Sequence, residues 1–98
     1  MDDIYKINDI QTRLAPVFSA NGVKSAVLYG SYAKGSANPK SDVDLLVDSG
    51  LCGLDFVGLI EIIREALDKE VDVIDVRYVK KDSPVANEIL QTGVRIYG

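Results

Sequence analysis

The stretch Gly-Ser-Tyr-Ala-Lys-Gly-Ser-Ala-Asn-Pro-Lys-Ser-Asp-Val-Asp, residues 30–44, holds the residues that decide the fold and the chemistry of this chain. Gly30-Ser31 follows an apolar segment, and Asp42-Val43-Asp44 opens the next one after a gap of ten residues. A helix that begins directly after a glycine turn presents free backbone N–H groups and a partial positive charge, which attract phosphate. Gly30 lets the backbone approach a ligand closely, and Ser31 adds a hydroxyl. The stretch therefore predicts a phosphate-binding turn beside a carboxylate pair.

The carboxylate pair is predicted to lie on one face of a strand. Asp42 and Asp44 are two residues apart, so their Cα atoms are about 6.6–6.8 Å apart and their side chains project to the same side. Left alone, two such charges repel each other and one tends to hold a proton. Mg²⁺ removes the conflict because it prefers carboxylate, water and phosphate oxygens, and two ions about 3.5–4 Å apart organise phosphoryl or nucleotidyl transfer. We expect a site for two Mg²⁺ ions with Asp42 and Asp44 as ligands.

A third acid for such a site is expected from the segment Glu-Val-Asp-Val-Ile-Asp-Val, residues 70–76. On a strand, Asp72 shares a face with Ile74, whereas Asp75 shares the other face with Val73. The strand period does not choose between Asp72 and Asp75, so both stay candidates at this point.

Apolar spacing predicts alternating helices and strands along the chain. We expect helices over residues 4–20, 31–37 and 54–68 and a short one from Ser83-Pro84 to near Gly93. We expect strands over residues 23–29, 42–48 and 70–79 and a small edge strand over 94–97. Pro16 is expected to bend or divide the first helix. The pattern predicts a single α/β (α+β) domain over residues 1–98, with a small mixed sheet of three to four strands packed against helices.

Composition narrows the classes of function. The 98 residues carry a net charge of -4 and include no histidine and one cysteine, Cys52. The absence of histidine excludes Ser-His-Asp and Cys-His catalysis, and the acidic balance argues against nucleic-acid binding. Because the N-terminus lacks signal-peptide features and no apolar run approaches about 20 residues, we expect a cytoplasmic protein that does not bind or cross a membrane. A Walker A loop is excluded, because Ser36 stands where lysine is required.

The Gly-Ser pair, the ten-residue gap and the Asp-x-Asp pair together resemble the signature of the DNA polymerase beta-like nucleotidyltransferase superfamily. Length and flanks are similar to those of its smallest branch, the minimal nucleotidyltransferase (MNT) domains of HEPN–MNT toxin–antitoxin pairs. The likeness runs over nearly the whole chain and rests mainly on residues 29–35, 41–47 and 71–74. It implies a polymerase beta-like nucleotidyltransferase fold. It also selects Asp72 as the third carboxylate, because the family carries that acid in a Val-Asp-Leu/Val segment.

The resemblance also implies a role for each site residue. The catalytic and metal-binding residues that it implies are Asp42, Asp44 and Asp72. The nucleotide-binding residues that it implies are Gly30, Ser31, Lys34 and Ser41. Gly30 and Ser31 are expected to contact the triphosphate, and Asp72 to complete one metal site and help activate the attacking hydroxyl. The role of Ser41 stays open between assisting the nucleotide and serving only as a turn hydroxyl.

Two functions remain in competition. The resemblance implies transfer of AMP from ATP to a tyrosine of a partner HEPN ribonuclease toxin, so that the chain acts as an antitoxin. The alternative is a non-catalytic antitoxin that neutralises its partner by contact alone. It is motivated by Leu54, Val57 and Ile62, which widen the apolar stripe of the helix over 54–68 beyond one contact face. The wide apolar stripe has another explanation, in which these residues are buried under the sheet or at a homodimer interface and not in a hetero-oligomer with the partner. Transfer to a small molecule is disfavoured, because the chain has no room for a second, acceptor-binding domain.

Overall fold

The computed structural model describes residues 4–98, so Met1, Asp2 and Asp3, part of the signal-peptide argument, lie outside the described residues. The helices are α1 (Ile7–Ala20), α2 (Ser31–Lys34), α3 (Gly53–Leu67), η1 (Val76–Tyr78, a 3₁₀ turn) and α4 (Pro84–Thr92). The strands are β1 (Ser25–Tyr29), β2 (Val43–Asp48), β3 (Val71–Asp75) and β4 (Val94–Tyr97). They form one sheet in the order β3-β2-β1-β4. Only β2 and β3 run parallel, which confirms the predicted mixed sheet.

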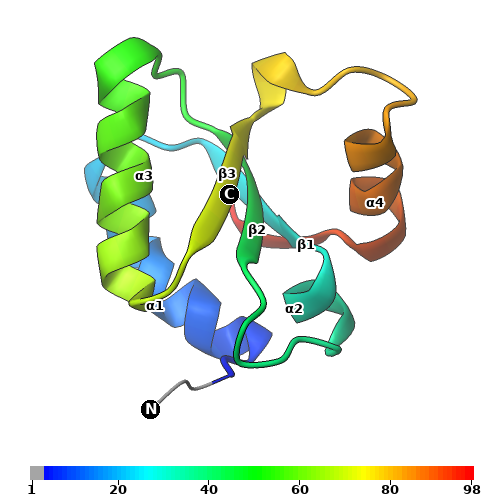
Figure 1. Cartoon of the computed structure of the whole chain (residues 1–98). Coiled ribbons are helices and arrows are strands. Elements are labelled where there is room, and N and C mark those ends of the chain that lie inside the picture. The colour runs from blue at the N-terminus through cyan, green and yellow to red at the C-terminus, as the bar shows by residue number, and fades with distance from the viewer. Residues whose placement is uncertain (1–3) are drawn as a thin grey trace.

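One face of the sheet is covered by helices α1 and α3, which lie together beside it in Figure 1. Alternate residues of the central strands are fully buried there, because successive side chains of a strand point to opposite faces. The buried strand residues are Ala26, Leu28, Val43, Leu45 and Val47. The helices contribute Ile10, Leu14, Phe18, Leu59, Ile63 and Leu67 to the same core. The opposite face of β1, β2 and β3 carries polar side chains and is approached by α4, which contacts β1.

The structure differs from the sequence-based expectation at several element ends and at Pro16. Helix α1 begins at Ile7 rather than at residue 4, and β1 begins at Ser25 rather than at residue 23. The third strand ends at Asp75, where the carboxylate accepts a hydrogen bond from the Arg77 N–H and starts η1. The helix after Gly30 has only four residues, because Gly35 takes a left-handed conformation and ends it. Helix α1 is not divided at Pro16, which lies inside it on the exposed side. The predicted end of the first helix at residue 20 is confirmed, with Asn21 as its C-cap. The predicted helix start at Ser83-Pro84 is confirmed too, with Ser83 as the N-cap of α4.

Helix α3 leaves part of its apolar surface uncovered. Leu54 is 88% exposed, Val57 53% and Ile62 41%, so the expectation that they are buried under the sheet is wrong. Helix α3 buries the stripe of Leu59, Ile63 and Leu67 in the core and packs Phe56 and Ala66 partly against it. None of the helices within residues 4–98 is long and apolar enough to cross a membrane.

Candidate functional site

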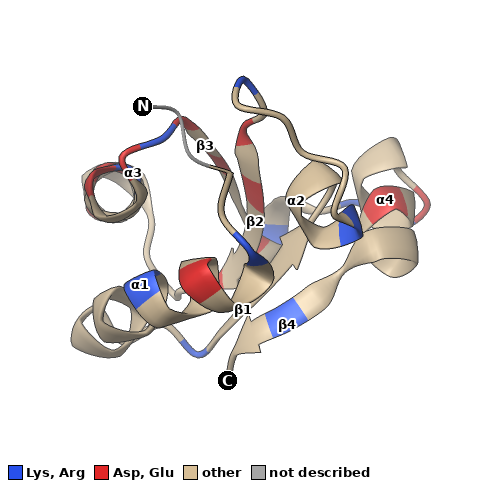
Figure 2. Ribbon diagram, turned by 90° about the horizontal axis from the view of Figure 1, so that it is seen from below, with Lys and Arg blue, Asp and Glu red and all other residues tan. Residues whose placement is uncertain are grey.

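A row of three polar side chains crosses the face of the sheet that is opposite α1 and α3. Tyr29 pairs with Asp44 in the β1–β2 register, and Asp44 pairs with Asp72 in the β2–β3 register. Directly paired residues on adjacent strands project to the same face, so the two carboxylates and the phenol are neighbours. Figure 2 shows acidic positions of β2 between β3 on one side and α2 on the other. Because the row crosses three strands, its geometry is set by backbone pairing.

Gly30 follows directly after this row and packs against it. Its backbone has φ 75° and ψ -151°, a region that essentially only glycine populates. A Cβ atom at this position would overlap Oδ2 of Asp44, so a side chain here would displace that carboxylate. The Gly30 carbonyl accepts a hydrogen bond from the Lys34 N–H (3.0 Å), which closes the single turn of α2. The turn and the carboxylate thus occupy one continuous site.

The site accumulates negative charge. Burial and, after it, the nearby carboxylates of Asp72, Asp42 and Glu88 in that order together raise the pKa of Asp44 to about 6. Burial and the charges of Asp44, Asp72 and Glu88 likewise raise the pKa of Tyr29 to about 12, so its phenol stays neutral. Uncompensated charge of this kind favours a bound cation.

The other predicted nucleotide and metal residues lie around this row. Asp42 is exposed and lies one residue before β2, whereas the sequence-based expectation placed it within the strand. Its negative charge nevertheless contributes to the raised pKa of Asp44. Lys34 is exposed at the end of α2, and Ser31 begins that helix. The Ser41 hydroxyl accepts a hydrogen bond from the Asn38 N–H (3.0 Å), so in this structure it serves the turn before β2.

Asp75 lies on the opposite face from Asp72. Its side chain is 1% exposed and accepts hydrogen bonds from Ser49 Oγ (2.8 Å) and from Nε of Arg77 (3.0 Å). Arg77 also donates to the Leu51 carbonyl. Burial alone would raise the pKa of Asp75, but the hydrogen bonds from Arg77 and Ser49 outweigh it and hold the pKa below its ordinary value. Asp75 is therefore used structurally, and Asp72 is the acid that the fold brings beside Asp44.

The donor set of the row fits Mg²⁺ in chemistry. Asp44 and Asp72 are neighbouring carboxylates, Asp42 is close enough to add its charge, and Mg²⁺ takes oxygen ligands while keeping several waters. Within residues 4–98, no three acidic or cysteine side chains are grouped closely enough to form a metal site by themselves.

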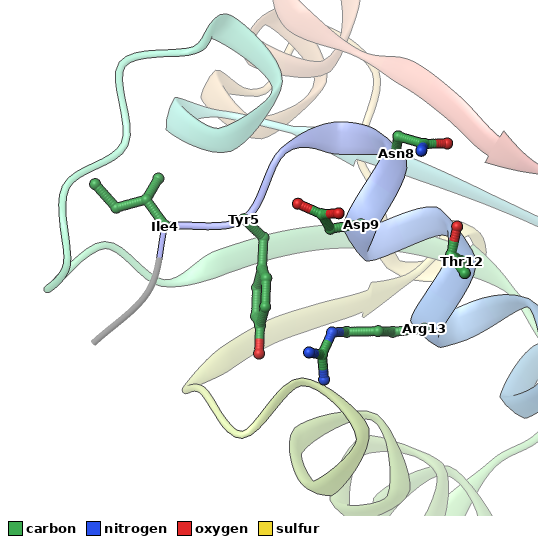
Figure 3. A pocket seen from close by; sticks show the side chains of 6 residues that line it. All are labelled: Ile4, Tyr5, Asn8, Asp9, Thr12 and Arg13. Atoms are coloured by element: carbon green, nitrogen blue, oxygen red, sulfur yellow. The ribbon is translucent and has the colours of Figure 1, made fainter. Parts of the chain in front are cut away.

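The hollow drawn in Figure 3 is a different feature. It lies at the start of α1 and is lined by Ile4, Tyr5, Asn8, Asp9, Thr12 and Arg13. The Tyr5 hydroxyl donates to the Leu67 carbonyl (2.6 Å), and the Arg13 guanidinium lies 4.7 Å from the centre of the Tyr5 ring. These contacts attach the N-terminal segment to the end of α3, and none of the lining residues belongs to the acidic row.

Sequence reasoning missed the contribution of α4. Glu88 adds negative charge beside Asp44 and Tyr29, and Thr92 accepts a hydrogen bond from the Gly30 N–H (2.9 Å). Both residues are distant from residues 30–44 in sequence and belong to no motif there. Their four-residue spacing, which places them on one face of α4, was the only available signal.

Comparison with known proteins places this chain in a family. The family model described as polymerase beta, nucleotidyltransferase matches residues 12–98. The chain therefore belongs to the polymerase beta nucleotidyltransferase family, as the resemblance implied. It is 41% identical over 70 residues to MJ0435, a candidate protein adenylyltransferase of Methanocaldococcus jannaschii, and the match covers 69% of this chain and 75% of that protein.

Solved structures share the fold at lower identity. A chain of a toxin–antitoxin structure with AMP-PNP has a TM-score of 0.76 and 23% identity, covering 90% of this chain and 73% of that one. A chain of the complex between tri-AMPylated Shewanella oneidensis HEPN toxin and MNT antitoxin has a TM-score of 0.71 and 20% identity, covering 94% and 72%. A candidate minimal nucleotidyltransferase has a TM-score of 0.72 and 24% identity, covering 92% and 95%. These likenesses confirm the predicted fold class.

Proposed function

We propose that this chain is a Mg²⁺-dependent nucleotidyltransferase that transfers AMP from ATP to a tyrosine hydroxyl of a HEPN toxin and thereby acts as its antitoxin. The observation that carries the proposal is the packing of the Gly30 turn against Asp44, in register with Asp72. Membership of the nucleotidyltransferase family and the likeness to a candidate protein adenylyltransferase support the reaction. The AMP-PNP and tri-AMPylated HEPN structures support the nucleotide and the partner.

In this proposal each part of the site has one task. Gly30 and Ser31 bind the triphosphate, and Lys34 adds a positive charge for a phosphate. The carboxylates of Asp42, Asp44 and Asp72 hold Mg²⁺, which when bound neutralises phosphate charge and lowers the pKa of the hydroxyl that attacks. The acceptor oxygen forms a bond to the α-phosphorus, the bond from that phosphorus to pyrophosphate breaks, and the hydroxyl proton leaves toward Asp72. Tyr29, neutral and beside Asp44, bounds the site.

The proposal is tested by label transfer. Purified protein, a HEPN partner, Mg²⁺ and α-labelled ATP are expected to give a labelled partner whose mass rises by one adenylyl group per modification. Asp44→Asn and Asp72→Asn are expected to abolish labelling. Asp48→Asn is the matched control, because Asp48 lies on the same face of β2 but pairs with Ser25 at the far end of the strand. Labelling that survives both active-site variants, or that Asp48→Asn abolishes equally, would sink the proposed reaction.

A second candidate, neutralisation by contact alone, is favoured by the exposed apolar residues of α3. Leu54 and Val57 project from the first turns of that helix with most of their surface uncovered. Under this alternative, Asp44→Asn still neutralises the toxin fully in cells, whereas Leu54→Glu with Val57→Glu does not. The enzymatic proposal expects neutralisation to be lost in Asp44→Asn.

A further inference from the structure

The last residue of α4 is bonded to the turn between β1 and α2. Thr92 Oγ1 accepts a hydrogen bond from the Gly30 N–H (2.9 Å) and donates its own proton to the Glu88 carbonyl (2.8 Å). A threonine hydroxyl has a single proton. Since that proton is directed to Glu88, a lone pair of the oxygen is left for the Gly30 N–H. The two bonds together fix the orientation of the hydroxyl.

Gly30 needs such an anchor because its backbone takes a conformation that essentially only glycine populates. Glycine loses more conformational freedom on folding than any other residue. Its carbonyl is held by the Lys34 N–H, and its N–H is held by Thr92. The peptide units on both sides of Gly30 are thereby fixed while its Cα stays against the Asp44 carboxylate.

Strand β4 keeps Thr92 in place. It begins two residues after Thr92, and Val94 pairs with Leu28, which lies two residues before Gly30. The end of α4 and the start of the turn are therefore joined by sheet pairing as well as by the hydrogen bond. The anchor therefore lies at the end of a helix that is followed directly by a strand of the sheet.

We propose that Thr92 is a positioning residue for the nucleotide, which acts by holding the Gly30 N–H and so keeps the turn in the conformation that receives the triphosphate. The inference rests on the proposed function of that turn. It assigns α4 a role in ATP binding although the helix lies outside the motif of residues 30–44. Loss of the hydroxyl loosens the turn in the free protein, so the effect falls on ATP binding more than on the chemical step.

The test compares Thr92→Val, which replaces the hydroxyl by a methyl group of similar size, with Thr92→Ser, which keeps the hydroxyl. Thr12→Val is the matched control, because Thr12 is an exposed threonine of α1 outside the acidic row. The first readout is hydrogen exchange of the Gly30 amide in the protein without ATP. The second is the KM for ATP and the kcat of label transfer.

In Thr92→Val the Gly30 amide is expected to exchange about tenfold faster and the KM for ATP to rise about tenfold, with kcat within about threefold. Thr92→Ser and Thr12→Val are expected to match the wild type. The proposal is overturned if the Gly30 amide of the wild type exchanges like an unprotected peptide, if its exchange is unchanged in Thr92→Val, or if Thr92→Ser exchanges as fast as Thr92→Val. These exchange results require no catalysis. An inactive wild type would instead count against the proposed function.

Discussion

Replacing Gly30 by alanine tests whether this glycine is required for activity more than for stability. The added Cβ would overlap Oδ2 of Asp44, the far end of a short side chain that can rotate away. Rotation relieves the overlap at small energetic cost, but it moves the carboxylate from its place beside Asp72. Gly30→Ala is therefore expected to harm AMP transfer far more than it harms folding.

The size of each effect follows from the backbone and from the site. Alanine at φ 75° and ψ -151° occupies a region that is essentially restricted to glycine, which costs about 1–3 kcal/mol. Displacing a reacting group by about 1 Å can cost about a hundredfold in rate. We expect Gly30→Ala to lose about 2 kcal/mol of unfolding free energy and at least about a hundredfold in kcat/KM for label transfer.

Gly35→Ala provides the matched control. Gly35 also has a positive φ, 76°, but no atom lies within 4 Å of the position of its Cβ. A left-handed alanine costs about 1–2 kcal/mol, so this variant loses comparable stability without disturbing Asp44. Urea unfolding and label transfer are measured on both variants. If Gly30→Ala keeps its activity within twofold of Gly35→Ala, the reasoning that Gly30 is required to seat Asp44 is refuted.

Four further variants test the electrostatics, the core and the exposed side of α3. Asp44→Asn is expected to stabilise the metal-free protein by about 1 kcal/mol near pH 8 in urea unfolding, because an acid with its pKa raised to about 6 opposes folding once it is ionised. This gain in stability should vanish below about pH 4, where the wild-type carboxyl is protonated in the folded and the unfolded state. Asp75→Asn is expected to cost about 2 kcal/mol at neutral pH, because it weakens the hydrogen bonds of a buried carboxylate. Because folding lowers the pKa of Asp75, the ionised carboxylate stabilises the protein at pH values above about 3.9, the ordinary pKa of an aspartate, and this stabilisation is lost as the pH falls further. The unfolding free energies of the wild type and of Asp75→Asn should therefore converge in acid. Leu14→Ala should cost about 2–5 kcal/mol in the same assay, whereas Leu54→Ala on the exposed side of α3 should stay within about 0.5 kcal/mol. A large loss in Leu54→Ala would show that α3 is covered in solution.

Much of the fold could be predicted because its signals are local. The apolar run Leu45-Leu46-Val47 between acidic residues indicates a strand, and Ser83-Pro84 indicates a helix start. The end of β3 could not be predicted, because Asp75 stops the strand through contacts with Ser49 and Arg77 that form only in the folded chain. The strand period alone left Asp72 and Asp75 as equal candidates for the same reason.

The amino-acid sequence by itself determined the glycine turn, the carboxylate pair and the order of helices and strands, because these depend on neighbours within a few residues. The tertiary structure decided which groups meet. The parallel pairing of β2 with β3 sets Asp72 beside Asp44, and the pairing of β4 with β1 brings Thr92 to Gly30 across 62 residues of sequence. Such contacts depend on strand register and on the closing of long loops. For that reason no local pattern in residues 30–44 pointed to α4, although α4 holds the turn on which the site depends.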